Sequence, residues 1–236
     1  EKMSEIDTKF ENYITTLVGE DIFAKVHRVD EVFKTGVLTG NEGLGMQSLS
    51  KLAPIVQLKE KDNNKHEVIM LGSNSYLNLG TNPEVVSASK KALEKYGNGM
   101  GAVSNYAGIS ELHKELEQKI ARFYKQEDAI VFPSGYGTNI GVISALCNKG
   151  DVVINDSANH ASIFDGCLLS GADVRIFPHG NLDYLKKILS KLDDSQSGRL
   201  IITDGVFSMS GETAQLDEIY ELAKFYKARV MVGDAH

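Results

Sequence analysis

From about residue 66 onward, short apolar runs alternate with segments of helical spacing. Six runs of five residues are rich in β-branched side chains, and they lie at 67–71, 128–132, 151–155, 173–177, 199–203 and 229–233. The stretches VVIN at 152–155 and LIIT at 200–203 show no polar alternation, which indicates strands that are covered on both faces. We therefore predict an α/β fold with a mostly parallel sheet that carries helices on both faces.

The helices between these runs are marked by residues that favour helix ends. Asn82 caps a helix whose first residue is Pro83 and which ends at Gly97, the usual pairing of an N-terminal proline with a C-terminal glycine. Three further helices are expected to begin at or near Ser110, Asn181 and Leu216.

The first part of the chain has a different pattern. Residues 4–38 carry apolar side chains at helical spacing, namely Ile14, Leu17, Val18, Ile22 and Val26, and predict an amphipathic helical arm. Glycines then interrupt the pattern between residues 36 and 45, and the polar stretch 59–67 predicts a turn between two short extended segments. We divide the chain into a helical arm and linker at 1–60 and an α/β domain at 61–236.

Composition and charge narrow the class of protein. Hydrophobic residues make up 42% of the chain and charged residues 24%, which is typical of a globular protein. No segment approaches the ~20 consecutive apolar residues of a membrane span, so no transmembrane segment is expected. The net charge of −7, without a basic run, disfavours nucleic acid as a partner. Cys147 and Cys167 lack the spacing of metal ligands, so we predict reduced thiols, no metal site and a cytoplasmic protein.

Candidate chemistry is sought just after the strands, because the ligands of open α/β sheets bind beyond the carboxyl ends of the strands. After the run at 128–132, the sequence PSGYGTNIG places Ser134, Gly135 and Gly137 ahead of a helical stretch. A turn of small residues into a helix leaves free backbone N–H groups at the positive end of the helix dipole, which suits a phosphate. A plain strand-to-helix turn explains the same string equally well.

Polar residues also follow three other runs, and these are His160, then Asp204 and Ser208, then Asp234 and His236. An imidazole at the start of a helix, such as His160, can stack on a planar ring or carry a proton near neutral pH. Taken alone, a structural role for this histidine is the commoner case. His113 and His179 are interpreted as structural or surface residues.

Six strings occur together in this chain: LGSNSYLNL at 71–79, a glycine-rich stretch at 97–108, PSGYGTN at 133–139, NHASIFDG at 159–166, DGVFSMSGE at 204–212 and GDAH at 233–236. In this order they resemble the α-oxoamine synthase family of pyridoxal 5'-phosphate (PLP) enzymes. The resemblance implies that 61–236 is an incomplete large domain of a fold-type I PLP-dependent transferase. It also implies a homodimeric acyltransferase that condenses a small amino acid with an acyl-CoA or acyl-carrier thioester, usually with loss of carbon dioxide.

The resemblance assigns contacts with PLP or substrate to Asn74, Gly135, Tyr136, His160, Ser208, Asp234 and His236. By this resemblance, the main-chain N–H groups of Gly135 and Tyr136 hold the cofactor phosphate. His160 stacks on the pyridine ring and helps to position the amino acid, while His236 bonds the phenolate oxygen with Ser208 nearby. These two histidines are the implied catalytic residues, and Asn74 is expected at the substrate entrance.

The chain departs from the family pattern at two of the matched positions. The residue three before the final histidine is an aspartate in the family, where it pairs with the protonated pyridine nitrogen, but here it is Gly233. Asp234 is one residue out of step, so on an extended strand its side chain is expected on the opposite face. Either the ring nitrogen is unpaired, or local backbone geometry lets Asp234 take this role. Ser104 stands where the family usually has an arginine.

The family's Schiff-base lysine and substrate-carboxylate arginine lie beyond the final motif, and the chain ends at His236. We therefore expect this piece to be inactive alone, and no lysine in it is nominated as catalytic. Two alternatives stay open. One is a non-catalytic partner subunit, favoured by Gly233 and Ser104, and the other is a fold-type I aminotransferase or aldolase.

Overall fold

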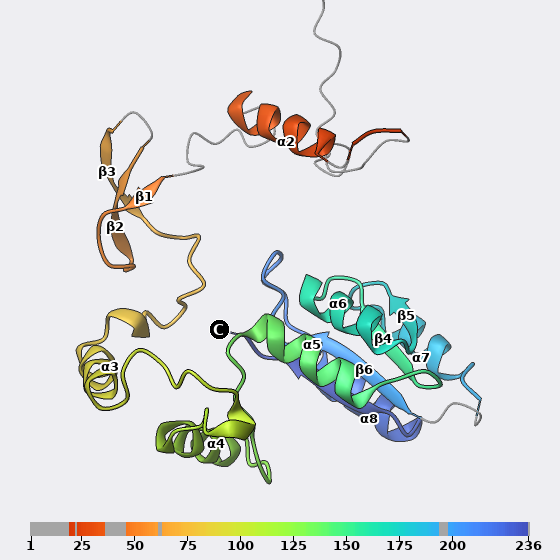
Figure 1. Ribbon diagram of the computed structural model, residues 1–236. Helices are drawn as coiled ribbons and strands as arrows, with labels where there is room; N and C mark the ends of the chain where they lie inside the picture. The colour runs from red at the N-terminus through yellow and green to blue at the C-terminus, as the bar shows by residue number, and fades with distance from the viewer. Residues whose placement is uncertain (1–18, 22, 36–45, 61–62, 194–197, 236) are drawn as a thin grey trace, which may run out of the picture. The chain divides into compact units, whose positions relative to one another are not determined.

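The computed structural model describes residues 19–21, 23–35, 46–60, 63–193 and 198–235 (Figure 1). The chain forms two compact units, Glu1–Gly97 and Asn98–His236. The predicted domain boundary at residue 60 concerns the cofactor-binding domain of the family, and it stays a prediction.

The first unit contains a helix and a small antiparallel sheet. Helix α2 spans Ala24–Thr35, so this part of the predicted arm is helical, whereas Ile14, Leu17, Val18 and Ile22 lie outside the described residues. Strands β1 (Gln47–Ser48), β2 (Ile55–Lys59) and β3 (Lys65–Ile69) pair in the order β1-β2-β3. The run predicted at 67–71 therefore forms most of β3, and the polar stretch before it contains the β2–β3 turn, as predicted.

The first unit ends with the 3-10 helix η1 (Leu79–Thr81) and helix α3 (Pro83–Tyr96). The side chain of Asn82 accepts hydrogen bonds from the N–H groups of Glu84 at 2.9 Å and Val85 at 3.4 Å. Gly97 ends the helix with a φ of 74°, a left-handed value that glycine adopts without strain. Both predicted ends of α3 are confirmed.

The second unit is built on a parallel sheet. Strands β4 (Val152–Asp156), β5 (Asp173–Phe177), β6 (Arg199–Asp204) and β7 (Arg229–Gly233) pair in the order β5-β4-β6-β7. Each neighbouring pair is parallel, and β4 is buried along its whole length. The predicted parallel sheet is confirmed, and its strand ends share one edge.

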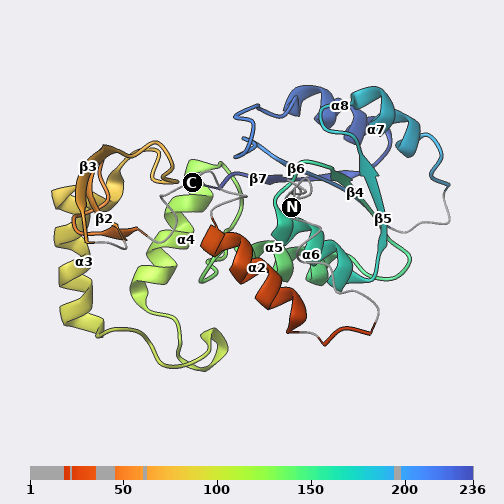
Figure 2. The ribbon, with the colours of Figure 1, turned by 90° about the horizontal axis from the view of Figure 1, so that it is seen from above.

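Helices cover both faces of this sheet (Figure 2). One face packs against α7 (Leu182–Leu189) and α8 (Leu216–Phe225), with Ile154 and Ile201 in the same apolar cluster. The other face packs against α5 (Gly135–Leu146) and α6 (Ala161–Ser170), with Val153 and Ile202 in the second cluster. Successive strand residues point to opposite faces, so strands between two helical layers need apolar residues at every position.

The segment before the sheet differs from the prediction at one run. Residues 98–127 include the 3-10 helix η2 (Ser104–Tyr106) and α4 (Glu111–Phe123), whose capping residue Ser110 bonds to His113. Residues 128–132, predicted as a strand, pair with no described strand, and Ile130 is 72% exposed. The N–H of Val131 donates instead to the Glu117 carboxylate at 3.3 Å. The predicted strand is therefore wrong in this structure, because a strand needs a neighbouring backbone to complete its ladder.

Candidate active site

The carboxyl ends of the strands bring polar residues to one edge of the second unit. Asp156 ends β4, Asp204 ends β6 and Gly233 ends β7. His160 caps α6, which follows β4. This is the edge at which ligands of open α/β sheets bind.

His160 is held by both its backbone and its ring. Its N–H donates to the Asp204 carboxylate at 2.8 Å. Its ring Nδ1 accepts the N–H of Ser162 at 3.2 Å and lies 2.7 Å from the Ser162 hydroxyl oxygen. Because Nδ1 accepts from the Ser162 backbone, the neutral ring carries its proton on Nε2. The imidazole plane is thus oriented by the first turn of α6.

The start of α5 offers two backbone donors. The Ser134 hydroxyl accepts the N–H of Gly137 at 3.0 Å, and the Ser134 carbonyl accepts that of Thr138 at 2.9 Å. Among the described residues, no acceptor faces the N–H groups of Gly135 and Tyr136. A Cβ atom on Gly135 would meet nothing within 4 Å, so this helix start is open. Open donors at a helix N-terminus suit a phosphate.

The two helix starts lie side by side. The ring centroids of Tyr136 and His160 are 6.2 Å apart, with the planes at 84°. The Tyr136 hydroxyl donates to the Asp165 carboxylate in α6, and this hydrogen bond raises the pKa of the tyrosine. The Tyr136 side chain therefore reaches from the start of α5 to α6, and its ring lies beside the imidazole of His160.

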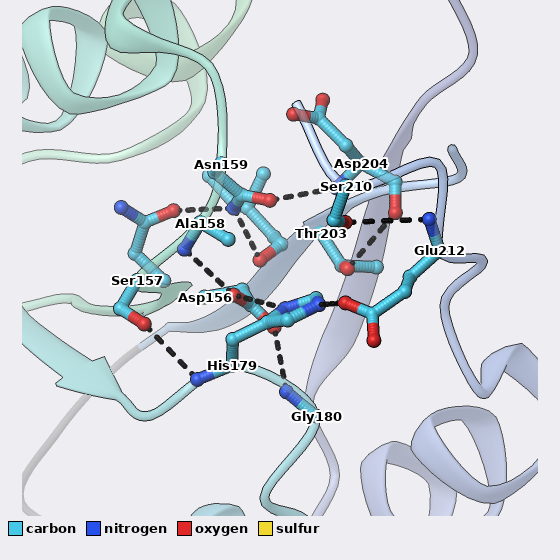
Figure 3. Close-up of polar contacts among 12 residues, drawn as sticks. Asp156, Ser157, Ala158, Asn159, His179, Gly180, Thr203, Asp204, Ser210 and Glu212 are labelled. Carbon is cyan, nitrogen blue, oxygen red and sulfur yellow. Dashed lines mark hydrogen bonds and ion pairs between the residues drawn. The ribbon is translucent and has the colours of Figure 1, made fainter. Parts of the chain in front are cut away.

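A polar network ties the loop before α6 to β6 (Figure 3). The Asn159 side chain accepts the N–H of Asp204 at 2.7 Å and donates to the carbonyl of Ile202 at 2.9 Å. The same amide donates to the side-chain oxygen of Asn155 at 2.6 Å, while the amide nitrogen of buried Asn155 has no partner in the described part of the chain. These bonds fix the loop on which His160 lies.

His179, which follows β5, has a larger role than the sequence indicated. Figure 3 shows its ring between two carboxylates, with Nδ1 at 3.0 Å from Asp156 and Nε2 at 3.0 Å from Glu212. Burial alone lowers the pKa of His179, but the two carboxylates outweigh it and raise the pKa. The Phe207 ring packs against the imidazole at 4.2 Å between centroids. His179 thereby holds the loop after β6 against β4, and its position directly after a strand was the signal for it.

The other four predicted site residues lie in different parts of the chain, and one of them lies outside the described residues. Ser208 lies exposed in the turn after β6, on the loop that His179 holds. Asp234 follows β7, and its carboxylate accepts the Tyr124 hydroxyl at 2.6 Å, which raises the pKa of the tyrosine. Asn74 is exposed in the first unit, and His236 lies outside the described residues. The roles assigned to all four stay predictions.

The residues at this edge fit a phosphorylated aromatic ring. The space beside Gly135 is open, and the N–H groups of Gly135 and Tyr136 donate to no acceptor among the described residues. His160 supplies a flat imidazole, and the Asp204 carboxylate lies beside its backbone. Within the described ranges, no group of three or more His, Cys, Asp or Glu residues could hold a metal ion. Nor does any described helix combine the length and apolar character that a membrane crossing requires.

Comparisons with known proteins agree with this geometry. The chain is 48% identical over 170 residues to the 8-amino-7-oxononanoate synthase of Thermoanaerobacter pseudethanolicus, a match that covers 72% of this chain and 43% of the relative. The corresponding enzyme of Bacillus pumilus is 49% identical over 173 residues, 73% of this chain and 44% of that one. The chain thus spans less than half the length of these relatives.

Solved structures give the same result. The serine palmitoyltransferase of S. paucimobilis, solved with a bound PLP–myriocin aldimine, superposes with a TM-score of 0.81 at 32% identity, over 90% of this chain and 52% of that one. The Sphingomonas wittichii enzyme superposes with a TM-score of 0.82, with the same identity and coverage. The predicted fold-type I PLP transferase architecture is confirmed.

The sequence model of the family described as "Aminotransferase class I and II" matches residues 66–236, which contain every strand of the parallel sheet and the residues of its carboxyl edge. This chain belongs to the aminotransferase class I and II family.

Proposed function

We propose that the whole protein is a PLP-dependent acyltransferase of the α-oxoamine synthase type, which condenses a small amino acid with an acyl thioester. The observation that carries the proposal is the pair of open backbone donors at the start of α5, the helix whose Tyr136 ring contacts the oriented ring of His160. The relatives named 8-amino-7-oxononanoate synthase and serine palmitoyltransferase support the same reaction class. PLP, when bound, supplies the electron sink that stabilises a carbanion at the α-carbon of the amino acid.

The protein's own contribution is to hold the cofactor and to orient its ring. The N–H groups of Gly135 and Tyr136, at the positive end of the α5 dipole, bind the phosphate. His160 lies flat against the pyridine ring, since Ser162 and Asp204 fix its ring and backbone. Its Nε2 has no hydrogen-bond partner among the described residues, and we assign it to hold a proton toward the substrate. Ser208 and His236 are assigned to the phenolate oxygen, and Asn74 to the substrate entrance.

The partners follow from the reaction. We propose that the substrates are an amino acid and an acyl-CoA or acyl-carrier thioester. We also propose that the protein is a homodimer in the cytoplasm. A non-catalytic partner subunit is the competing assignment, because Gly233 removes the carboxylate expected at the end of β7. A fold-type I aminotransferase or aldolase would use the same cofactor site for a different reaction.

PLP binding by the full-length protein tests this assignment first. Titration with PLP should produce a saturable visible absorbance band, and His160→Ala should weaken or shift it. His66→Ala is the matched control, because His66 lies in the antiparallel sheet of the first unit and pairs with Glu60. A wild-type protein that binds no PLP would refute the proposal.

Product analysis separates the competing assignments. The acyltransferase should release coenzyme A from a thioester only when an amino acid is added. Release of an oxo acid without thioester consumption would indicate an aminotransferase. A protein that binds PLP but turns over no substrate would indicate the partner subunit.

A further inference from the structure

A bound PLP ring needs a partner for its pyridine nitrogen. Enzymes of this cofactor place an aspartate or an arginine there, and a carboxylate keeps the nitrogen protonated. The position to which the resemblance assigns this aspartate is Gly233, which has no side chain. The question is which group of this chain takes its place.

The neighbouring strand fills the position in front of Gly233. Strands β6 and β7 are parallel, and Asp204 is the register partner of Gly233 at the ends of the two strands. Paired residues of adjacent strands project to the same face of a sheet. A Cβ atom added to Gly233 would clash with Oδ1 of Asp204, so the carboxylate of Asp204 lies across the glycine. Asp204 thus occupies the space that a side chain at position 233 would enter.

The Asp204 carboxylate is tied to the ring-stacking residue. Oδ2 accepts the N–H of His160 at 2.8 Å, and the N–H of Asp204 itself is held by Asn159 at 2.7 Å. Partial burial raises the pKa of Asp204, and nearby Asp156 acts in the same direction, while the His160 N–H and side chain lower it. No lysine, arginine or histidine of the described ranges forms an ion pair with Asp204. The carboxylate is partly buried beside the candidate ring site without a cation.

The other carboxylates near this edge are engaged elsewhere. Asp156 bonds to His179 at 3.0 Å and to the backbone of its own loop. Asp234 accepts the Tyr124 hydroxyl at 2.6 Å. Asp165 accepts the hydroxyl of Tyr136. Each has a side-chain donor, whereas Asp204 has only the N–H of His160 among the described residues.

We infer that Asp204, on the strand next to Gly233, is the carboxylate that pairs with the protonated pyridine nitrogen of bound PLP in this protein. The inference rests on the proposed function. Oδ2 keeps the hydrogen bond from the His160 N–H, and Oδ1 accepts a hydrogen bond from the protonated ring nitrogen. Asp204 and Gly233 are then a coupled pair, in which the glycine makes room for the carboxylate of its neighbour.

The protonation state of the ring nitrogen tests this inference without relying on turnover. The full-length protein is loaded with PLP labelled with 15N in the ring, and the 15N chemical shift reports whether the nitrogen carries a proton. The wild-type shift should be that of a protonated nitrogen. Asp204→Asn, which keeps an oxygen for the His160 N–H, should move the shift to that of an unprotonated nitrogen. Asp234→Asn is the matched control and should leave the shift unchanged.

Two further variants test the role of Asp204 by substitutions other than Asp204→Asn. The exchange Asp204→Gly with Gly233→Asp moves the carboxylate to the adjacent strand and should restore the protonated shift. Gly233→Ala places a methyl group against Asp204 Oδ1, so it should displace the carboxylate and lower the protonated fraction. Circular dichroism of each variant confirms that it is folded before its shift is interpreted.

The outcomes separate the inference from the proposed function. If the wild-type protein takes up no PLP, the proposed function itself fails. If it takes up PLP but the shift responds to Asp234→Asn and not to Asp204→Asn, the inference is overturned and the function stands. An unprotonated nitrogen in the wild-type protein overturns it as well.

Discussion

Gly166 of α6 faces α5 at close range, and a larger side chain there tests the packing beneath the candidate site. A Cβ atom at this position would lie 3.0 Å from the main-chain oxygen of Asn139 and 3.0 Å from Cδ1 of Ile143. The Asn139 oxygen belongs to a helix backbone, which cannot rotate away as a side chain can. Gly166→Val adds two methyl groups beyond that Cβ, so α5 and α6 must move apart.

The cost follows from two opposing effects. Over-packing a well-packed interior destabilises a protein by about 1–3 kcal/mol. Valine recovers only part of the ~1 kcal/mol by which glycine is less favourable than alanine in a helix. We expect Gly166→Val to lower the free energy of unfolding by about 2 kcal/mol. With a urea dependence of about 3 kcal/mol/M, the unfolding midpoint should fall by about 0.7 M.

Far-UV circular dichroism of the full-length protein in urea measures this shift. Gly135→Val is the matched control, because a Cβ atom there would meet nothing within 4 Å. This control should change the free energy of unfolding by less than about 0.5 kcal/mol when PLP is omitted. Equal midpoints for Gly166→Val and the wild-type protein would refute the close packing of α5 on α6.

Three further predictions concern the pH dependence, a helix cap and a thiol. Because the pKa of His179 is raised above 6.5 in the folded state, its protonated ring adds stability that is complete below the unfolded pKa and lost as pH rises through the folded one. Thermal unfolding should therefore show a decline of stability as pH rises above 6.5, and His179→Gln should remove this decline, whereas an unchanged profile would contradict the ion pairs. Asn82→Ala should cost about 1 kcal/mol through loss of the α3 cap, and no loss of helical stability would show the cap to be unimportant. Burial raises the pKa of Cys167 to about 11, so a thiol reagent at pH 8 should label it far more slowly than the unfolded chain, and equal rates would argue against this.

Local features were predictable because their causes lie within a few residues. The cap of α3 depends on Asn82, Pro83 and Gly97, and the α7 cap Asn181 bonds to the N–H of Tyr184 at 2.9 Å. The continuous apolar runs of β4 and β6 predicted a sheet covered on both faces, because burial on two sides leaves no room for polar alternation. His160 was identified at a helix start by the same local logic.

Features that need a distant partner were missed or left open. Residues 128–132 have the composition of a strand, but the backbone of a strand needs a neighbour that sequence does not name. His179 was interpreted as structural or surface, and its contact with Glu212 joins residues 33 positions apart. The position of His179 after a strand end did indicate a site residue. The spacing of residues in the sequence, however, does not identify the two carboxylates that contact it.

The sequence alone determined the family, the α/β architecture and the strand ends that bear polar residues, because these follow from local pattern and from six short motifs. Only the tertiary structure decided which of these residues meet. The register of β6 and β7 sets Asp204 opposite Gly233, while Asp234 turns to Tyr124. A shift of one residue along a strand sends a side chain to the other face, so the identity of the carboxylate beside the ring site depends on strand pairing and not on motif position.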